Sequence, residues 1–282
     1  MPIPGDSLSS NTAVAAFAYH DVTDRPHESG LQRPGAAAYT LSGAAFGRHL
    51  DAIASGLLRP ELVTAIDLTA PGQHLLLTFD DGGKSALHVA DKLSHRGWRG
   101  HFFIITDRIG ERTFLDADEI RYLRRCGHVV GSHSHTHPDI FREQTIAQMV
   151  TEWRTSSDRL ADLLGEPCTV ASVPGGDISQ LVLASAGIAG LRFLFTSEPT
   201  LAPRSAGGCW VLGRFCPKAT TLPTRIRELA GFRGWGRALL VRQLKAFVRI
   251  TLPGPYRRYV RGQARDLTFA RDGLGPRVSE EG

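Results

Sequence analysis

The chain carries the stretch Leu75-Leu76-Leu77-Thr78-Phe79-Asp80-Asp81-Gly82-Gly83, a short apolar run that ends in two carboxylates and two glycines. The run does not alternate between apolar and polar residues, so it predicts a parallel strand that is covered on both faces. Sites in α/β proteins lie at the carboxyl ends of such strands, and glycine permits a tight turn there. One carboxylate is a candidate metal ligand and the other a candidate proton acceptor. The alternative is a turn in which an Asp caps the next helix.

Strands and helices alternate on both sides of this stretch. Strands are predicted at residues 14–19, 75–80, 101–106, 128–131, 169–173, 193–196 and 211–215. Helices with an apolar stripe are predicted between them, among them residues 42–57 and 145–164. About seven strands joined by right-handed crossovers predict an α/β fold, a distorted seven-stranded β/α barrel that is closed or nearly closed. Residues 24–38 are rich in Pro, Gly and charge and are predicted to form a long loop.

The composition favours an ordinary globular enzyme or binding domain. The 282 residues are enough for one large α/β domain or two small ones, and the net charge is +5. The four cysteines form no C-x-x-C pair, so we expect unpaired, buried thiols, with disulfides as the alternative. Residues 1–11 do not resemble a signal peptide, and no apolar run reaches transmembrane length. A cytoplasmic location is therefore expected.

The last part of the chain differs in composition from the predicted barrel. Between Arg225 and Arg265 the only acidic residue is Glu228, and leucines interleave with Arg and Lys in the pattern of a basic amphipathic helix. We therefore predict a barrel at residues 12–216 and a basic helical extension and tail at residues 217–282. The extension either packs on the barrel or contacts an anionic membrane surface or a phosphorylated partner. Nucleic acid is not an expected partner, because no nucleic-acid-binding motif accompanies the basic residues.

A second group of candidate site residues is the histidine cluster in Ser132-His133-Ser134-His135-Thr136-His137-Pro138. Pro138 and the Ser and Thr spacers favour a loop or a strand end over a helix. Three histidines within five residues, just past a predicted strand, favour a metal site over a structural role. Two histidines and a carboxylate form a ligand set suited to zinc or a similar divalent ion.

These two stretches resemble the first and second motifs of the polysaccharide deacetylases, carbohydrate esterase family four. The matching segments are Thr78-Phe79-Asp80-Asp81-Gly82 and Ser132-His133-Ser134-His135-Thr136-His137-Pro138, and their order and separation also fit. The resemblance extends over about residues 14–215. It implies a distorted seven-stranded β/α barrel and a metal-dependent N-deacetylase, a hydrolase of amide bonds in N-acetylated sugars.

The resemblance also implies a role for each matching residue. Asp81, His133 and His137 become the ligands of a divalent metal, for which zinc is the expected ion. Asp80 becomes the general base that takes a proton from water. His135 falls at a position that is not a ligand in the family, and we expect it in the second shell or in the cavity wall.

The chain departs from the commonest family pattern in two places. The late Leu-x-His motif is missing, and the early segment Tyr19-His20-Asp21-Val22 resembles a rearranged branch in which the acid histidine follows the first strand. His20 is therefore the candidate general acid, and a helix-capping or structural histidine is the alternative. The third motif keeps Pro174 and Gly175, which we expect to contact substrate, but it lacks the preceding Arg that orients the base. Arg214 or Arg192 is the candidate replacement.

The leading function is removal of acetyl groups from N-acetylated sugars of a polysaccharide or of a lipid-linked precursor. A protein acting on such a precursor is expected at the inner surface of the membrane, held there by residues 225–265. Two alternatives remain open from the sequence: a metal amidohydrolase of a small non-sugar amide, and a carbohydrate-binding pseudoenzyme. The complete Asp-Asp and His-x-x-x-His set argues against the pseudoenzyme, and the altered third motif keeps it open.

Overall fold

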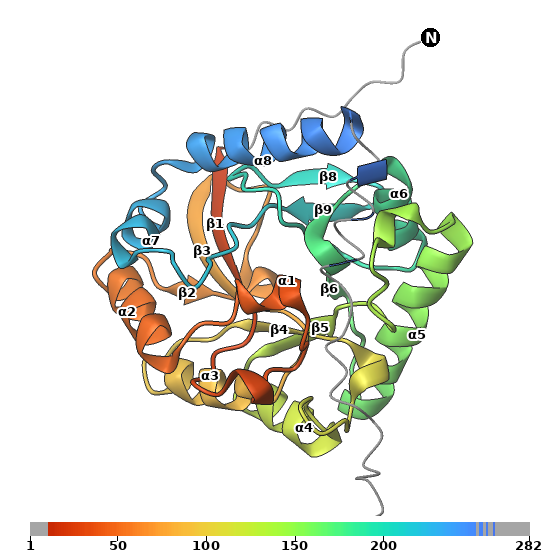
Figure 1. Cartoon of the computed structure of the whole chain (residues 1–282), viewed down its shortest axis with the longest axis horizontal. Helices are drawn as coiled ribbons and strands as arrows, with labels where there is room; N and C mark the ends of the chain where they lie inside the picture. Colours follow the sequence, from red (N-terminus) through yellow and green to blue (C-terminus); the bar gives the residue numbers. More distant parts are fainter. Residues whose placement is uncertain (1–10, 252–253, 256–257, 259–261, 263–282) are drawn as a thin grey trace, which may run out of the picture.

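The computed structural model describes residues 11–251, 254–255, 258 and 262. Its sheet curls into the predicted barrel (Figure 1). Seven parallel strands of the described part follow one another in the order β1 (Thr12–Tyr19), β3 (Gly72–Phe79), β4 (His101–Ile104), β5 (Val129–Ser132), β6 (Val170–Ser172), β7 (Phe193–Phe195) and β9 (Cys209–Leu212). All seven lie where the sequence predicts strands, give or take a few residues at their ends.

Two further strands extend the sheet. The short β2 (Pro60–Glu61) pairs with β3, and β8 (Arg204–Ala206) runs antiparallel to β9 as a hairpin. The barrel nearly closes where Phe215, just past β9, bridges to β1. Its N–H donates to the carbonyl of Ala16 over 2.9 Å, and its carbonyl accepts from the N–H of Ala18 over 2.8 Å. The first and last parallel strands are therefore neighbours.

Helices surround the sheet (Figure 1). The longer ones that lie between its strands in the sequence are α2 (Gly43–Ala54), α3 (Ser85–Ser94), α4 (Ala117–Arg125), α5 (Ile146–Leu164) and α6 (Gln180–Ile188). The longest, α5, begins at a capping box made by Thr145 and Gln148 and ends at Gly165, whose φ of 71° is accessible to glycine. The helix α2 ends at Ala54, three residues before the predicted end, and leaves Leu57 fully exposed.

The predicted long loop at residues 24–38 contains two short helical turns, η1 (Pro26–Glu28) and α1 (Pro34–Ala37). These turns were not predicted because they are short, and four residues are too few to show a periodic apolar stripe. The turn α1 lies over the strands in the middle of Figure 1. This loop therefore covers one end of the barrel.

The basic extension begins with α7 (Pro223–Ala230) and α8 (Trp235–Thr251). Ile226, Leu229 and Trp235 are buried in the same apolar core as the barrel, and the rings of Trp235 and Phe17 are 6.3 Å apart. The start of the extension thus packs on β1.

The surface of α8 is less buried. Leu239 is half-buried, and the residue after it, Leu240, is 57% exposed. Of the predicted apolar residues Leu244, Phe247 and Val248 the structure describes the helical backbone but not the side chains. Residues 252–253, 256–257, 259–261 and 263–282 of the predicted tail lie outside what the structure describes. In the described part of the chain, no helix is both long enough and apolar enough to cross a bilayer.

Candidate active site

The two carboxylates at the end of β3 reach the same cavity because the chain turns between them. The N–H of Asp80 still donates to the carbonyl of Tyr19 over 2.9 Å, as the continuation of the sheet ladder. Asp81 then has a φ of 77° and Gly82 a φ of 78°. Positive φ is uncommon for a residue with a Cβ but is tolerated by Asp. This turn brings both carboxylates to the lining of one cavity.

The histidine segment after β5 is held in a bent conformation by α5. The N–H groups of His135 and Thr136 donate to one oxygen of Glu152 over 2.9 and 2.8 Å, and the Thr136 hydroxyl donates to the other. Within the segment Ser134 and His137 have positive φ, 62° and 53°. The bend brings the rings of His133 and His137 to a centroid distance of 5.0 Å. The predicted non-helical segment is therefore present.

Asp81, His133 and His137 converge as the resemblance implied. Their ligand atoms all lie within 4.8 Å of one another, with 3.4 Å from His133 Nε2 to Asp81 Oδ1 and 3.9 Å from His137 Nε2 to the same oxygen. His133 Nδ1 donates to the carbonyl of Ser172 over 2.9 Å, which leaves Nε2 free to bind a cation.

The donor set and its electrostatics fit a divalent cation. Burial alone would lower the pKa of His133, but Asp80 and Asp81 outweigh burial and raise it. The two carboxylates thus make this cavity wall strongly negative. Burial, together with the neighbouring His133, lowers the pKa of His137 to about 4, so this ring is neutral and able to ligate. Its buried Nδ1 has no hydrogen-bond partner among the described residues.

His135 does not join this cluster. Its Nδ1 lies 3.0 Å from the hydroxyl of Thr106, and its Nε2 lies 3.8 Å from a carboxylate oxygen of Asp107. Of the two places expected for His135, the cavity wall is wrong, because the residue is absent from the cavity lining, and the second shell stays a prediction. In an extended segment His133, His135 and His137 would point to the same face, but this segment bends at Ser134, so His135 does not point into the cavity with the other two.

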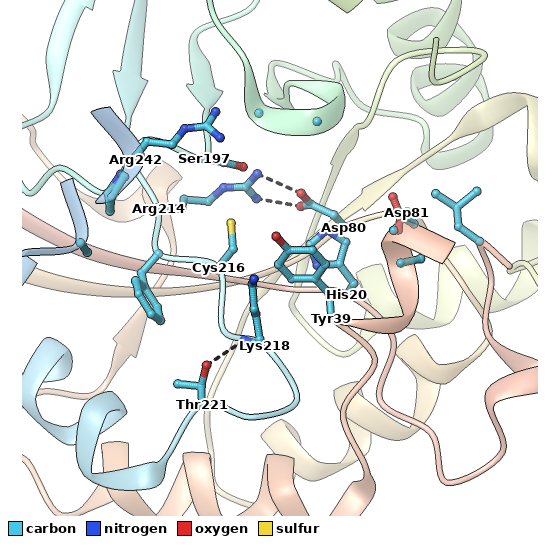
Figure 2. Close-up of a pocket in the computed structure, with 18 of the residues that line it drawn as sticks. His20, Tyr39, Asp80, Asp81, Ser197, Arg214, Cys216, Lys218, Thr221 and Arg242 are labelled. Carbon is cyan, nitrogen blue, oxygen red and sulfur yellow. Dashed lines mark hydrogen bonds and ion pairs between the residues drawn. The ribbon is translucent and has the colours of Figure 1, made fainter. Parts of the chain in front are cut away.

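Asp80 is held by the buried Arg214, one of the two candidates for the missing third-motif Arg. Arg214 Nη1 and Nη2 donate to the two carboxylate oxygens over 2.7 and 2.9 Å (Figure 2). The guanidinium also donates to the Thr78 hydroxyl, the Ser172 hydroxyl and the Thr196 carbonyl. Arg192, the other candidate, is exposed and lies over the ring of Phe193.

This network orients Asp80 and keeps it ionised. Burial would raise the pKa of the carboxyl, but Arg214 and then His133 outweigh burial and hold the pKa below its ordinary range. The Ser172 hydroxyl donates to Asp80 over 3.1 Å and so fixes the carboxylate further. Asp80 can therefore accept a proton at neutral pH, and its fork-shaped partner leaves little freedom to rotate.

His20 lies at the same end of the barrel, just past β1. Its ring packs on Tyr39 at a centroid distance of 5.2 Å, and both residues line the cavity beside Asp80 and Asp81 (Figure 2). His20 Nδ1 is buried with no hydrogen-bond partner among the described residues. The adjacent Asp21 has a different role, because its carboxylate accepts from Ser29, Gly30 and Ser85 and ties the loop to the barrel.

The cavity has a volume of about 700 Å³, within the range of ligand pockets. Gly175 lines it as expected, and so does Gly176, whereas Pro174 is buried and does not. The loop before α2 contributes residues such as Arg33 and Tyr39, which sequence reasoning missed. Other unforeseen lining residues follow β9 and belong to α7 and α8, and they are Cys216, Lys218, Thr221, Arg225, Arg237, Ala238, Val241 and Arg242.

Comparison with known proteins agrees with the motifs. Residues 67–194 match the family model described as polysaccharide deacetylase. A search of curated protein sequences found no significant match.

Solved structures share the fold over most of the chain. The Streptococcus pyogenes deacetylase PplD is 17% identical with a TM-score of 0.62, over 76% of this chain and 96% of PplD. IcaB from Ammonifex degensii is 19% identical with a TM-score of 0.61, over 78% of this chain and 98% of IcaB. A de-N-acetylase from Aggregatibacter actinomycetemcomitans is 16% identical with a TM-score of 0.63, over 77% and 99%. Residues 67–194, which hold both motifs, therefore resemble the polysaccharide deacetylases, a family of amide-bond hydrolases, and the solved structures show that the chain shares their fold.

Proposed function

We propose that the protein is a metal-dependent N-deacetylase of N-acetylated sugars, from a polysaccharide or its lipid-linked precursor. The observation that carries this proposal is the cluster of Asp81, His133 and His137 next to a buried carboxylate that is held by an arginine. The family match supports deacetylation of a polysaccharide. The choice of zinc, the metal dependence and the lipid-linked precursor rest on the donor set and on the basic extension.

Each residue has one task in the proposed reaction. A divalent cation held by Asp81, His133 and His137 would polarise the amide carbonyl and make a bound water more acidic. Asp80 accepts the proton of the attacking water, and the Arg214 fork keeps the carboxylate aimed at it. His20 donates a proton to the departing amine, since its free Nδ1 is buried at the cavity wall.

The metal is tested by removing one ligand at a time. His133→Ala is expected to lose bound zinc and to release no acetate from N-acetylglucosamine oligosaccharides, because one of the three protein ligands is gone. His135→Ala is the matched control, since it removes an imidazole two residues away that contacts Thr106. Metal content is measured by elemental analysis after dialysis, and acetate release after reloading with zinc.

Three results would contradict this proposal. Equal zinc content in the His133→Ala and His135→Ala variants would show that His133 is not a metal ligand. A zinc-loaded wild-type protein that binds sugars but releases acetate from no N-acetylated sugar would favour the carbohydrate-binding pseudoenzyme instead. Release of acetate from small non-sugar amides only would favour the amidohydrolase.

We further propose that the basic extension holds the protein at the inner surface of the membrane. The supporting observations are the exposed Leu240 and Val241 on α8, in a segment rich in Arg. Each cationic residue close to an anionic bilayer contributes on the order of 1 kcal/mol. Sedimentation with vesicles containing one third anionic lipid is expected at low salt and to weaken at high salt. A Leu240→Glu variant should bind more weakly, and equal recovery in the supernatant with neutral and anionic vesicles would reject the contact.

A further inference from the structure

We propose that the sugar substrate carries a phosphate group and that Lys218 and Arg237 bind it. This inference rests on the proposed function, since it concerns the far wall of the same cavity. Asp80, Asp81 and the two histidines lie at one end, and the segment after β9 together with α8 supplies Lys218 and Arg237 at the wall.

The charge of this cavity favours an anion. Its lining holds six cationic side chains and three carboxylates. One carboxylate is Asp80, which is paired with Arg214, and another is the candidate ligand Asp81, which lies 3.4 Å from His133 Nε2. The third, Asp139, lies 3.7 Å from Arg33. The wall away from the metal cluster is thus positive, and a neutral polysaccharide has no group that would compensate it.

The cations of the wall differ in how they are paired. Arg214 serves Asp80, and Arg242 contacts the carboxylate of Asp177. Arg225 donates to Glu228 over 3.0 Å and to the carbonyl of Gly234 over 2.8 Å.

Lys218 and Arg237 stand apart from these. Neither has an ion pair or a side-chain hydrogen bond within the described part of the chain, although both line the cavity. Both line the same cavity without an ion pair, and a phosphate dianion binds such cationic side chains through charge-assisted hydrogen bonds.

The position of Lys218 connects this wall with the catalytic end. Its ammonium lies 5.8 Å from the centre of the Tyr39 ring, and Tyr39 in turn packs on His20. Figure 2 shows the side chain pointing from its loop toward Tyr39 and Cys216. The N–H of Lys218 donates to the Thr221 hydroxyl over 2.8 Å, which fixes the loop. An anion at Lys218 is therefore separated from the proposed acid by a single ring, a span suited to one sugar unit.

The substrate class that fits is an N-acetylated sugar with a phosphate on the same or the adjacent unit. A polyprenyl diphosphate sugar and a soluble sugar phosphate share this chemistry. The two differ in the lipid, whereas Lys218 and Arg237, which both belong to the basic extension, would bind the phosphate of either one.

The test compares substrates that differ in charge. Acetate release is measured for methyl N-acetylglucosaminide, N-acetylglucosamine 1-phosphate and a short-chain polyprenyl diphosphate of the same sugar. The wild type is expected to prefer one or both phosphorylated substrates in kcat/KM. Lys218→Ala and Arg237→Ala should each lower the ratio of phosphorylated to neutral kcat/KM about tenfold to a hundredfold, whereas Lys218→Arg should keep most of it. Arg227→Ala is the matched control, because it removes one exposed charge from α7 outside the cavity.

A binding measurement separates this inference from the proposed function. Glucosamine 1-phosphate is titrated calorimetrically into the wild type and into the Lys218→Ala, Arg237→Ala double variant, each loaded with zinc. Weaker binding in the double variant supports the phosphate site even when no sugar is deacetylated. Equal binding in both proteins, or an unchanged substrate ratio in an active enzyme, overturns it. The faster of the two phosphorylated substrates identifies the lipid-linked or the soluble source.

Discussion

Replacing Asp80 with Asn is expected to lower acetate release by about 10³-fold or more while the zinc content stays at the wild-type level. The amide of Asn cannot accept the proton of the attacking water, and general base catalysis contributes about 10²–10⁴-fold. The metal ligands are untouched, since Asp81, His133 and His137 keep their positions. Rate and metal content are measured on the same preparation.

A variant of the proposed general acid, His20, can be compared with Asp80→Asn in turnover and in zinc content. His20→Ala is expected to lower turnover by about 10²–10⁴-fold with product binding kept, because the leaving amine then takes its proton from solvent. Loss of zinc in Asp80→Asn would show that Asp80 is itself a ligand. Full turnover in His20→Ala would assign the acid to another residue of the cavity.

The second large effect concerns Arg214, and it acts on stability as well as on rate. Both partners of the Asp80–Arg214 pair are buried, and removing one partner of a buried pair costs about 3–5 kcal/mol. Arg214→Met, which keeps much of the volume, should therefore lower the free energy of unfolding by that amount. The pKa of Asp80 should rise, because burial is then no longer outweighed by its strongest opposing partner.

A double variant tells whether the pair is the cause. In Asp80→Asn, Arg214→Met neither charge of the pair remains, so the loss of stability should be smaller than the sum of the two single losses. Arg214→Lys keeps the charge but not the fork, and it should fall between wild type and Arg214→Met. Denaturant unfolding followed by fluorescence measures the wild type, the three single variants and the double variant. A wild-type midpoint for Arg214→Met would refute the structural role of this arginine.

The sequence predicted the barrel and the metal cluster for different reasons. The strands were visible because a buried parallel strand is a continuous apolar run, such as the one before Asp80. The metal cluster followed from the family motifs, and the structure brings Asp81, His133 and His137 together. The sequence offered Arg214 and Arg192 as partners for Asp80 and could not choose between them, because a partner 134 residues away leaves no local pattern.

Other parts of the site had no signal in the sequence. Tyr39 lies in a loop without periodicity, and its contact with His20 depends on how that loop folds over the strands. The sequence showed that the extension is basic and amphipathic, but it did not show that the extension lines the cavity. Periodicity shows that α8 has an apolar side and a polar side, yet it does not show which side chains face a cavity. Arg237 was therefore indistinguishable from the other arginines of the segment.

The bridge between Phe17 and Phe215 has a consequence for the order in which the nascent chain can fold. Strand β3 and its carboxylates leave the ribosome long before β9 and Arg214. At roughly 5–20 residues per second, the 134 residues between Asp80 and Arg214 take on the order of ten to thirty seconds to synthesise. Until then the interior offers Asp80 no arginine, so burial of this carboxylate is unfavourable. Barrel closure and pairing of Asp80 with Arg214 are therefore expected together, in one late step of folding.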